Sequence, residues 1–402
     1  MSFPNVNEQL DLITTNIDEL LPVDELEKKI IKSWKNNIPL NIKLGCDPSR
    51  PDLHIGHSVV LNKLKNFQEL GHNVILVIGD FTAMIGDPTG RNKTRPQIDL
   101  KETKENSKTY IDQVSKIINI DKTRIVYNSK WLNNINLSKV ISLSSKFTLA
   151  QFLERDDFSK RYKNGKPISL HEFMYPLAQA YDSVYLRSDV EIGGTDQKFN
   201  LLLARDLQKE YDIDPQIALT MPLIEGTDGT DKMSKSYDNY IAFNDNPNDM
   251  YGKALSIPDV LIIKYFNLVT NLNYKEIKDY EFMLDAGKIS HRDLKRKLGR
   301  EIVSLYYDNK LASSAEQHFD NIFVNKGIPD NIPEINISEN IKIVDLIKKS
   351  NLVNSNSEVR RLIKQGAVKV DDVTISNIHH EIISKGKYII KIGKRKFLKV
   401  NS

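Results

Sequence analysis

The stretch DLHIGHSVVLNKLKNFQELGHNVILVIGD, residues 52–80, decides the fold class of this chain. From residue 54 its apolar side chains recur at helical spacing, and Gly71 follows as a typical helix C-cap. Residues 73–80 form a continuous apolar run, which is typical of a buried parallel strand. The segment NIKLGCD, residues 41–47, predicts a strand before the helix. The order strand, helix, strand predicts a βαβ unit.

The same alternation continues through the first half of the chain. RIVYN, residues 124–128, predicts a strand, and residues 169–186 predict a helix despite Pro176. VEIGGTDQKFN follows that helix, and the Gly/Pro-rich residues 81–91 follow a strand end, where open α/β sheets bind ligands. We therefore expect an α/β fold built on a doubly wound parallel sheet.

Composition limits the class of protein further. The 402 residues are 40% hydrophobic and 27% charged, and we find no apolar run long enough to cross a bilayer. The N-terminal stretch carries acidic residues and no early basic ones, so it resembles neither a secretory signal nor a transit peptide. A single cysteine, Cys46, fits a reducing compartment. These features predict a cytoplasmic protein without membrane partners.

The last third of the chain has a different pattern. Residues 245–320 show helical periodicity almost throughout, whereas residues 325–340, with two Pro and many Asn, predict a linker. Residues 341–402 predict two short helices followed by strands, and they hold 14 Lys and Arg against 5 Asp and Glu. This basic unit predicts contact with a polyanion.

Three short motifs indicate the chemistry: HIGH at 54–57, GGTDQ at 193–197 and KMSKS at 232–236. Their combination resembles the class I aminoacyl-tRNA synthetases, and the surrounding residues resemble the bacterial tyrosyl-tRNA synthetases over nearly the whole chain. The resemblance implies a Rossmann-type catalytic domain, then an α-helical domain, then a small α+β S4-like RNA-binding domain. The expected boundaries are 1–225, with a connective and dimerisation insertion at about 128–186, then 226–324, the linker 325–340, and 341–402.

Activation of an amino acid by ATP requires groups that position the reactants and stabilise phosphate charge. His54 and His57, in the first turn of a helix, can donate hydrogen bonds to phosphate oxygens, and Gly56 lets the nucleotide approach the backbone. Lys232 and Lys235, on a glycine-flanked loop, can close over the leaving pyrophosphate. These four side chains are the expected catalytic residues. By resemblance, the ATP-binding residues are Asp47, His54, Gly56, His57, Gly194, Asp196 and Lys235.

The resemblance also places a tyrosine pocket on Asp87, Tyr175, Gln179, Asp182 and Gln197. Positions 175, 179 and 182 share one helix face. Asp87, Tyr175 and Gln179 can accept the N–H donors of an α-ammonium group, and Asp182 can accept from a phenol. Many bacterial tyrosyl enzymes have a tyrosine at the position of Lys43, closing the phenol end of the pocket. Lysine at this position, as in one branch of the family, implies that selection of tyrosine depends more heavily on Asp182.

The remaining expectations concern partners. Arg360, Arg361 and Lys364 in SEVRRLIKQG can follow an RNA backbone, and the resemblance implies tRNA(Tyr) as that RNA. Arg91 and Arg95 fit phosphate or tRNA contacts, or surface solubility, equally well. The resemblance implies L-tyrosine and ATP with Mg²⁺ as substrates, no protein-bound metal, and a homodimer. Two rival interpretations are a tryptophanyl enzyme and an RNA-binding protein that has lost catalysis. Asp182 and the basic tail argue against the first, and intact HIGH and KMSKS against the second.

Overall fold

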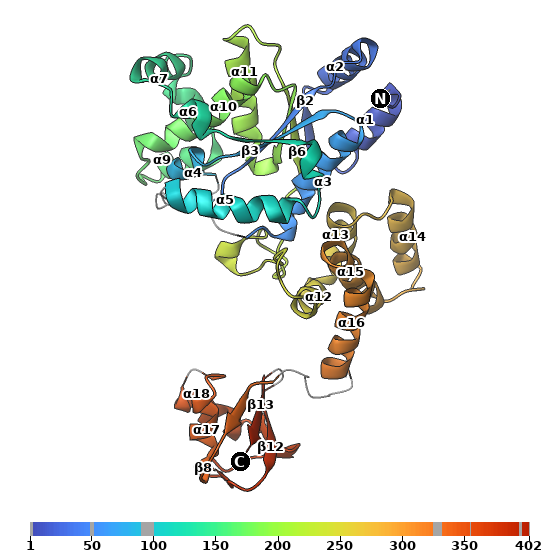
Figure 1. The fold of residues 1–402 in the computed structure, drawn as a ribbon, viewed down its shortest axis with the longest axis vertical. Helices are drawn as coiled ribbons and strands as arrows, with labels where there is room; N and C mark the ends of the chain where they lie inside the picture. Colours follow the sequence, from blue (N-terminus) through green and yellow to red (C-terminus); the bar gives the residue numbers. More distant parts are fainter. Residues whose placement is uncertain are drawn as a thin grey trace. The chain divides into compact units, whose positions relative to one another are not determined.

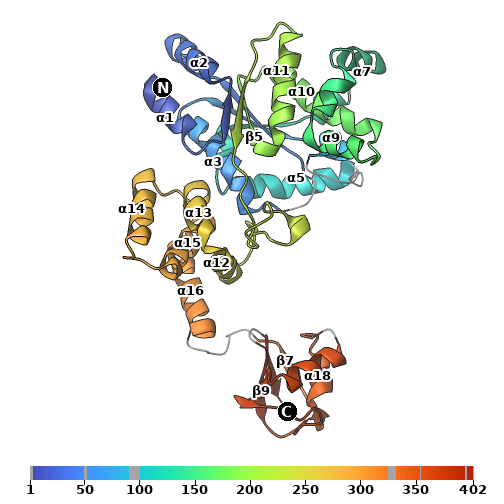
Figure 2. The same ribbon diagram turned by 180° about the vertical axis from the view of Figure 1, so that it is seen from behind.

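A computed structural model describes residues 3–48, 52–89, 100–324, 332–353, 355–393 and 396–401. The chain forms two compact units, Met1–Ser313 and Ser314–Ser402. Figures 1 and 2 show the elements of each unit from opposite sides.

The first unit is organised around a six-stranded sheet with the order β1-β6-β5-β2-β3-β4. Five of these strands are parallel, and β1 pairs antiparallel with β6 at the edge. The chain therefore reverses direction across the sheet between β2 and β5, as in a Rossmann-type doubly wound fold. The strands are β1 Glu19–Leu21, β2 Asn41–Cys46, β3 Asn73–Ile78, β4 Thr123–Tyr127, β5 Val190–Gly194 and β6 Ile217–Met221.

Helices cover both faces of this sheet, with α3 and α5 on one face and α10 and α11 on the other (Figures 1 and 2). The expected α/β class and sheet type are confirmed. The helices before β6 are α1 Val6–Thr14, α2 Val23–Asn36, α3 Ile55–Glu69, α4 Thr82–Ile85, α5 Leu100–Val114, α6 Ser129–Leu132, α7 Leu137–Ser144, α8 Leu149–Leu153, α9 Asp156–Lys163, α10 Met174–Leu186 and α11 Lys198–Lys209.

Local sequence explains the two helices that matter most for the site. Helix α3 begins directly after His54, whose backbone is extended, and Gly71 beyond its end adopts a φ of 91°. Helix α10 accommodates Pro176 because the proline lies in its first turn, where a backbone N–H has no partner within the helix. Both helices agree with the sequence prediction.

The helical part that follows β6 completes the first unit, and α16 continues into the second. A Cβ on Gly299 would lie 2.9 Å from the ring of Tyr251, so glycine permits α15 to pack closely on α12. The helices are α12 Pro247–Ser256, α13 Ile262–Val269, α14 Tyr274–Asp285, α15 His291–Tyr306 and α16 Asn309–Phe319.

The second unit packs α17 and α18 with a five-stranded sheet of order β10-β9-β12-β13-β7 and a two-stranded sheet of β11 and β8. Its core is aliphatic and includes Ile347, Val359 and Ile390, each fully buried. The elements are β7 Glu334–Asn336, β8 Ile341–Lys342, α17 Ile343–Lys349, α18 Asn356–Lys364, β9 Val368–Val370, β10 Val373–Thr374, β11 Glu381–Ile382, β12 Lys387–Ile392 and β13 Lys396–Asn401.

The expected linker needs one correction. Within residues 325–340, the structure forms β7, which pairs in parallel with β13. Ile335 packs against the core of the second unit, and Glu334 lies 2.5 Å from the Lys399 ammonium. These contacts order a three-residue strand that has no periodicity of its own.

Within the described residues, no helix is long and apolar enough to span a bilayer.

Candidate active site

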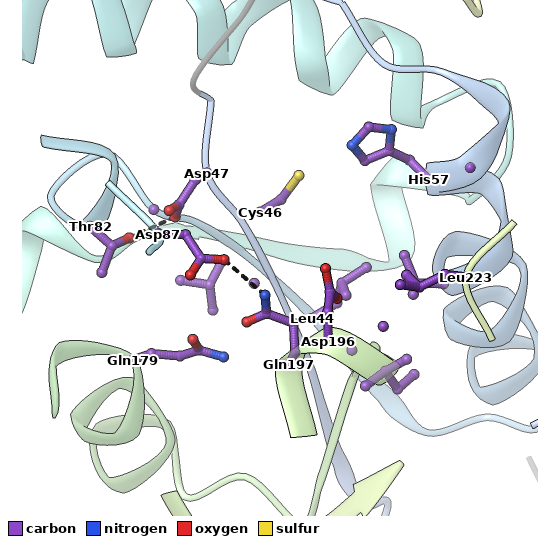
Figure 3. A pocket seen from close by; sticks show the side chains of 18 of the residues that line it. Leu44, Cys46, Asp47, His57, Thr82, Asp87, Gln179, Asp196, Gln197 and Leu223 are labelled. Carbon is purple, nitrogen blue, oxygen red and sulfur yellow. Dashed lines mark hydrogen bonds between the residues drawn. The ribbon is translucent and has the colours of Figure 1, made fainter. Parts of the chain in front are cut away.

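A cavity of about 330 Å³ opens at the carboxyl ends of the central strands, where β2 and β5 lie side by side (Figure 3). Open α/β sheets bind ligands at this point of reversal. Among the described residues, every predicted ATP or tyrosine contact except Lys235 lines this cavity. The predicted residues brought together are Asp47, His54, Gly56, His57, Asp87, Tyr175, Gln179, Asp182, Gly194, Asp196, Gln197 and Lys232.

The two histidines of the HIGH motif lie against each other, with ring centroids 4.0 Å apart. Burial lowers the pKa of His54 well below its usual value and that of His57 to about 4. Both rings are therefore neutral at pH 7, and each offers one N–H donor. Glycine is required at position 56 because a Cβ there would lie 2.9 Å from the His54 ring.

The lysines of the KMSKS motif occupy different places. The Lys232 ammonium lies 2.8 Å from the Asp196 carboxylate and lines the cavity. The Lys235 ammonium instead donates to the backbone carbonyl of Asp52, on the segment that precedes the HIGH helix. Both cations thus stand near the histidine side of the site, but only one faces the cavity.

Asp87 forms an anionic centre inside the cavity. Gln197 Nε2 donates to one of its carboxylate oxygens at 2.8 Å, as Figure 3 shows, and Thr89 donates to the other from both its backbone and its hydroxyl. Burial alone would raise the pKa of Asp87, but the Arg155 guanidinium, 3.4 Å away, and these donors outweigh it and hold the pKa below its usual value. The carboxylate therefore stays ionised and suits a cationic ligand group.

Asp47 lies between the part of the cavity predicted to bind the nucleotide and the part predicted to bind the amino acid. Its carboxylate accepts hydrogen bonds from Tyr175 Oη at 2.9 Å and from Thr82 Oγ1 at 2.7 Å. The second bond is drawn in Figure 3. A Cβ on Gly79 would lie 2.0 Å from Asp47 Oδ1, so this arrangement depends on glycine at the end of β3. Asp47 and Tyr175 therefore act as one hydrogen-bonded unit.

Asp182 lies at the buried end of the cavity and is only 3% exposed. Trp131 Nε1 donates to one carboxylate oxygen at 2.8 Å, and Asn128 Nδ2 donates to the other at 3.2 Å. Burial raises the pKa of Asp182 to about 7, although the nearby Lys43 ammonium and these two donors oppose the rise. The carboxyl can thus accept a hydrogen bond in a place from which water is largely excluded.

Lys43 does not line the cavity. Its side chain is fully buried beneath it and forms an ion pair of 2.9 Å with Glu191. Many tyrosyl enzymes close the phenol end of the pocket with a tyrosine at this position. Here the position holds Lys43, whose side chain is instead paired with Glu191 on the neighbouring strand.

Several residues that line the cavity or contact its carboxylates were not predicted, among them Thr82, Thr89, Asn128, Trp131 and Arg155. Asn128 follows strand β4 directly, and the rule that strand ends line such clefts gave a signal for it. Trp131, in α6, contacts Asp182, and Arg155, in the short connection between α8 and α9, contacts Asp87; nothing in their local sequence marks them.

The other predicted residues lie elsewhere. Arg360, Arg361 and Lys364 belong to α18 in the second unit, and all three are exposed. Arg91 and Arg95 fall outside the described residues. Within the described part of the chain, no three His, Cys, Asp or Glu side chains gather as metal ligands.

Comparison with known proteins identifies the class. Residues 35–324 match the family model described as tRNA synthetases class I (W and Y), so the chain belongs to that class. The tyrosine–tRNA ligase of Chlorobaculum tepidum is 53% identical over the whole of this chain and 98% of its own length. That of Thermotoga maritima is 50% identical over 98% and 97%. Within the class, the chain thus groups with the tyrosine–tRNA ligases, which confirms the predicted resemblance.

The second unit and the fold have matches of their own. Residues 324–400 match the model of the tyrosine–tRNA ligase SYY-like C-terminal domain. A tyrosyl-tRNA synthetase from Archaeoglobus fulgidus, solved with L-tyrosine, shares the fold with a TM-score of 0.63 at 20% identity, over 78% of this chain and all of that one. A truncated mitochondrial enzyme from Aspergillus nidulans gives the same TM-score at 24% identity, over 79% and 94%.

The raised pKa of Asp182 predicts a stability effect that depends on pH. The pKa of Asp182 in the folded protein, about 7, lies above the ordinary 3.8. Ionisation of Asp182 therefore destabilises the folded protein increasingly as pH rises from 3.8 to 7; the full effect is present above pH 7, and there is none below pH 3.8. We expect Asp182→Asn to gain stability relative to wild type as pH rises from 5 to 8, by on the order of 2 kcal/mol. Thermal unfolding at both pH values measures this difference.

The exposed Asp206→Asn variant is the matched control and should show no comparable change with pH. An equal difference between Asp182→Asn and wild type at pH 5 and 8 would contradict the assignment.

Proposed function

We propose that this chain activates L-tyrosine with ATP to form tyrosyl-adenylate and pyrophosphate, and then transfers tyrosine to the 3′ end of tRNA(Tyr). The observation that carries the proposal is the pairing of two carboxylates in one cavity. Asp87 is ionised and suits an α-ammonium group, whereas Asp182 lies at the buried end and suits a phenol O–H. The free amino acid that presents both groups is tyrosine.

The amino-acid side works by complementary hydrogen bonding. Asp87, Tyr175 and Gln179 receive the α-ammonium group, and Gln197 holds Asp87 in place. Asp182, oriented by Trp131 and Asn128, accepts a hydrogen bond from the phenol O–H. Phenylalanine offers no donor there, so its binding leaves a buried acceptor unpaired, which costs free energy.

The nucleotide side lies at the start of α3 and at the end of β5. Neutral His54 and His57 donate to phosphate oxygens, while Gly194 and Asp196 hold the ribose. ATP enters as its Mg²⁺ complex, so the metal belongs to the substrate. The tyrosine carboxylate oxygen attacks the α-phosphorus and the bond to pyrophosphate breaks; Lys232 and Lys235 stabilise the charge on the leaving group. Positioning and electrostatics supply the catalysis, and no side chain acts as general base.

For the transfer step, the ribose hydroxyl of the terminal adenosine attacks the carbonyl of tyrosyl-adenylate and AMP leaves. The exposed cations Arg360, Arg361 and Lys364 on α18 support contact with the tRNA backbone. In this proposal residues 1–225 catalyse, residues 226–324 add the KMSKS loop and a helical tRNA-binding part, and the second unit holds RNA. A cytoplasmic location stays a prediction from the sequence.

A homodimer through residues 128–186 is part of the proposal. Apolar side chains in this insertion stay exposed on the single chain, and such exposure favours a protein interface. They include Leu137, Ile141, Leu149, Tyr162 and Leu170. We expect sedimentation equilibrium, which measures mass independently of shape, to give the mass of two 46.1 kDa chains; the mass of one chain would contradict the dimer.

The function is tested by ATP–pyrophosphate exchange with a panel of amino acids. We expect exchange with L-tyrosine and not with tryptophan or phenylalanine. Asp182→Ala should lose the preference for tyrosine over phenylalanine, because the phenol acceptor is gone. Exchange with tryptophan alone, or with none of the amino acids, would overturn the proposal.

Lys235→Ala tests the leaving-group role. The variant should slow adenylate formation by about tenfold or more, the effect of about 1.4 kcal/mol of transition-state stabilisation, with tyrosine affinity unchanged. Pre-steady-state adenylation and tyrosine titration measure the two separately. Lys116→Ala removes another lysine that donates to a backbone carbonyl, outside the cavity, and serves as the control. An unchanged adenylation rate in Lys235→Ala refutes the role.

The triple variant Arg360→Ala, Arg361→Ala and Lys364→Ala tests the RNA role. We expect tyrosine-dependent exchange to persist while tRNA affinity falls and its salt dependence becomes shallower by about 0.7 to 0.9 per lost phosphate contact. A matched triple variant of exposed lysines on α2 controls for lost charge; its positions are Lys28, Lys32 and Lys35. Equal tRNA affinity and salt dependence in the two triples count against the role.

A further inference from the structure

The ion pair beneath the cavity holds a catalytic-site side chain in one orientation. Lys43 on β2 and Glu191 on β5 are register partners in adjacent parallel strands, and both are at most 1% exposed. The Lys43 ammonium lies 2.9 Å from Glu191 Oε1 and donates to the Ser183 hydroxyl at 2.8 Å and to the backbone carbonyl of Gln179 at 3.0 Å. Two hydrogen bonds and one ion pair thus hold the buried ammonium in place.

Glu191 is correspondingly saturated with donors. Its Oε1 also accepts from Gln179 Nε2 at 3.1 Å, and its Oε2 accepts from the Ser183 hydroxyl at 2.9 Å and from Gln216 Nε2 at 2.5 Å. An ionised carboxylate accepts hydrogen bonds and cannot donate them. Only the amide nitrogen of Gln179 can therefore face Glu191.

The opposite end of the Gln179 amide is left for a ligand. Gln179 extends from α10 into the cavity (Figure 3) and lines it together with Asp87 and Tyr175. Its Oε1 is buried and accepts no hydrogen bond from the described part of the chain. A buried acceptor without a partner is costly, so a cationic donor that reaches it gains more than an ordinary hydrogen bond.

We propose that the Lys43–Glu191 pair is a positioning device, which fixes the Gln179 amide with its oxygen toward the α-ammonium group of the amino acid. This inference rests on the proposed function. It assigns to Lys43 a role at the ammonium end of the substrate, through Glu191 and Gln179, rather than at the phenol end. Neither Lys43 nor Glu191 touches substrate.

The key variant is Glu191→Gln. A glutamine at this position has its own N–H donors, so it can face Gln179 Oε1 and let the Gln179 amide turn its nitrogen toward the ligand. The ammonium group then meets a donor instead of an acceptor. Loss of a hydrogen bond to a charged group weakens binding by about ten- to a hundredfold.

Three ligands show whether the effect is confined to the ammonium end. L-Tyrosine and tyramine carry the ammonium group, whereas 3-(4-hydroxyphenyl)propanoate keeps the phenol and carboxylate but lacks the amine. In Glu191→Gln we expect the Kd of the first two to rise by about tenfold or more, with the Kd of the third within about twofold of wild type. Calorimetric titration measures all three, and the rate of adenylation at saturating tyrosine should change little.

Glu172→Gln is the control, because it disrupts another buried ion pair, with Arg161, whose residues do not line the cavity. It should leave all three affinities unchanged. If Glu191→Gln does not fold, as judged by circular dichroism, the double variant Lys43→Met with Glu191→Gln, which leaves no unpaired buried cation, receives the same measurements.

If Glu191→Gln weakens the binding of all three ligands equally, or of none of them, the proposal is overturned. Failure of the wild-type protein to bind L-tyrosine is a different result, which overturns the proposed function itself.

Discussion

The parallel pairing of β2 with β5 is the constraint on which the rest of this structure depends. It joins segments that lie far apart in the sequence, in a register that sets Lys43 opposite Glu191 and Leu44 opposite Ile192. The loops that leave these two strands then diverge, and the cavity forms between them. A shift of one residue in this register would turn each side chain to the other face of the sheet and separate the buried ion pair. The HIGH helix and the GGTDQ turn can meet only while this pairing holds.

The same cavity keeps two carboxyl groups in opposite electrostatic conditions. Around Asp87, a guanidinium and several donors more than compensate for burial. Around Asp182, burial dominates even though a lysine and two donors oppose it. The site is therefore polarised along its length, with strong negative charge at one end and a weakly ionised acceptor at the other. A ligand that enters in the reverse direction would bury its cationic group away from Asp87, which costs binding free energy. Orientation thus follows from charge as well as from shape.

Sequence reasoning was most successful where the signal is local. The strand, helix, strand order at residues 41–80 and the single face of α10 follow from short-range periodicity, and both agree with the structure. The lining of the cavity followed from motifs together with family resemblance. Edge strands β1 and β7 were missed because three residues carry too little pattern, and tertiary pairing orders them. Trp131 and Arg155 were missed because their contacts depend on how separate helical segments pack. The burial of Lys43 was missed for the same reason, since its partner Glu191 lies on a neighbouring strand that is far away in the sequence.

The support behind Asp182 has a consequence for protein engineering. Trp131 and Asn128 donate to its two oxygens, and the Lys43 charge acts on it from below. Replacing Asp182 by an apolar residue to admit a different amino acid therefore leaves two buried donors without an acceptor. Altering Trp131 also disturbs Tyr185, whose ring stacks on it at 4.5 Å. A library that varies only the residues touching the side chain of the new substrate would sample mostly destabilised proteins. Because these side chains depend on one another, substitutions at positions 128, 131 and 182 should be made together.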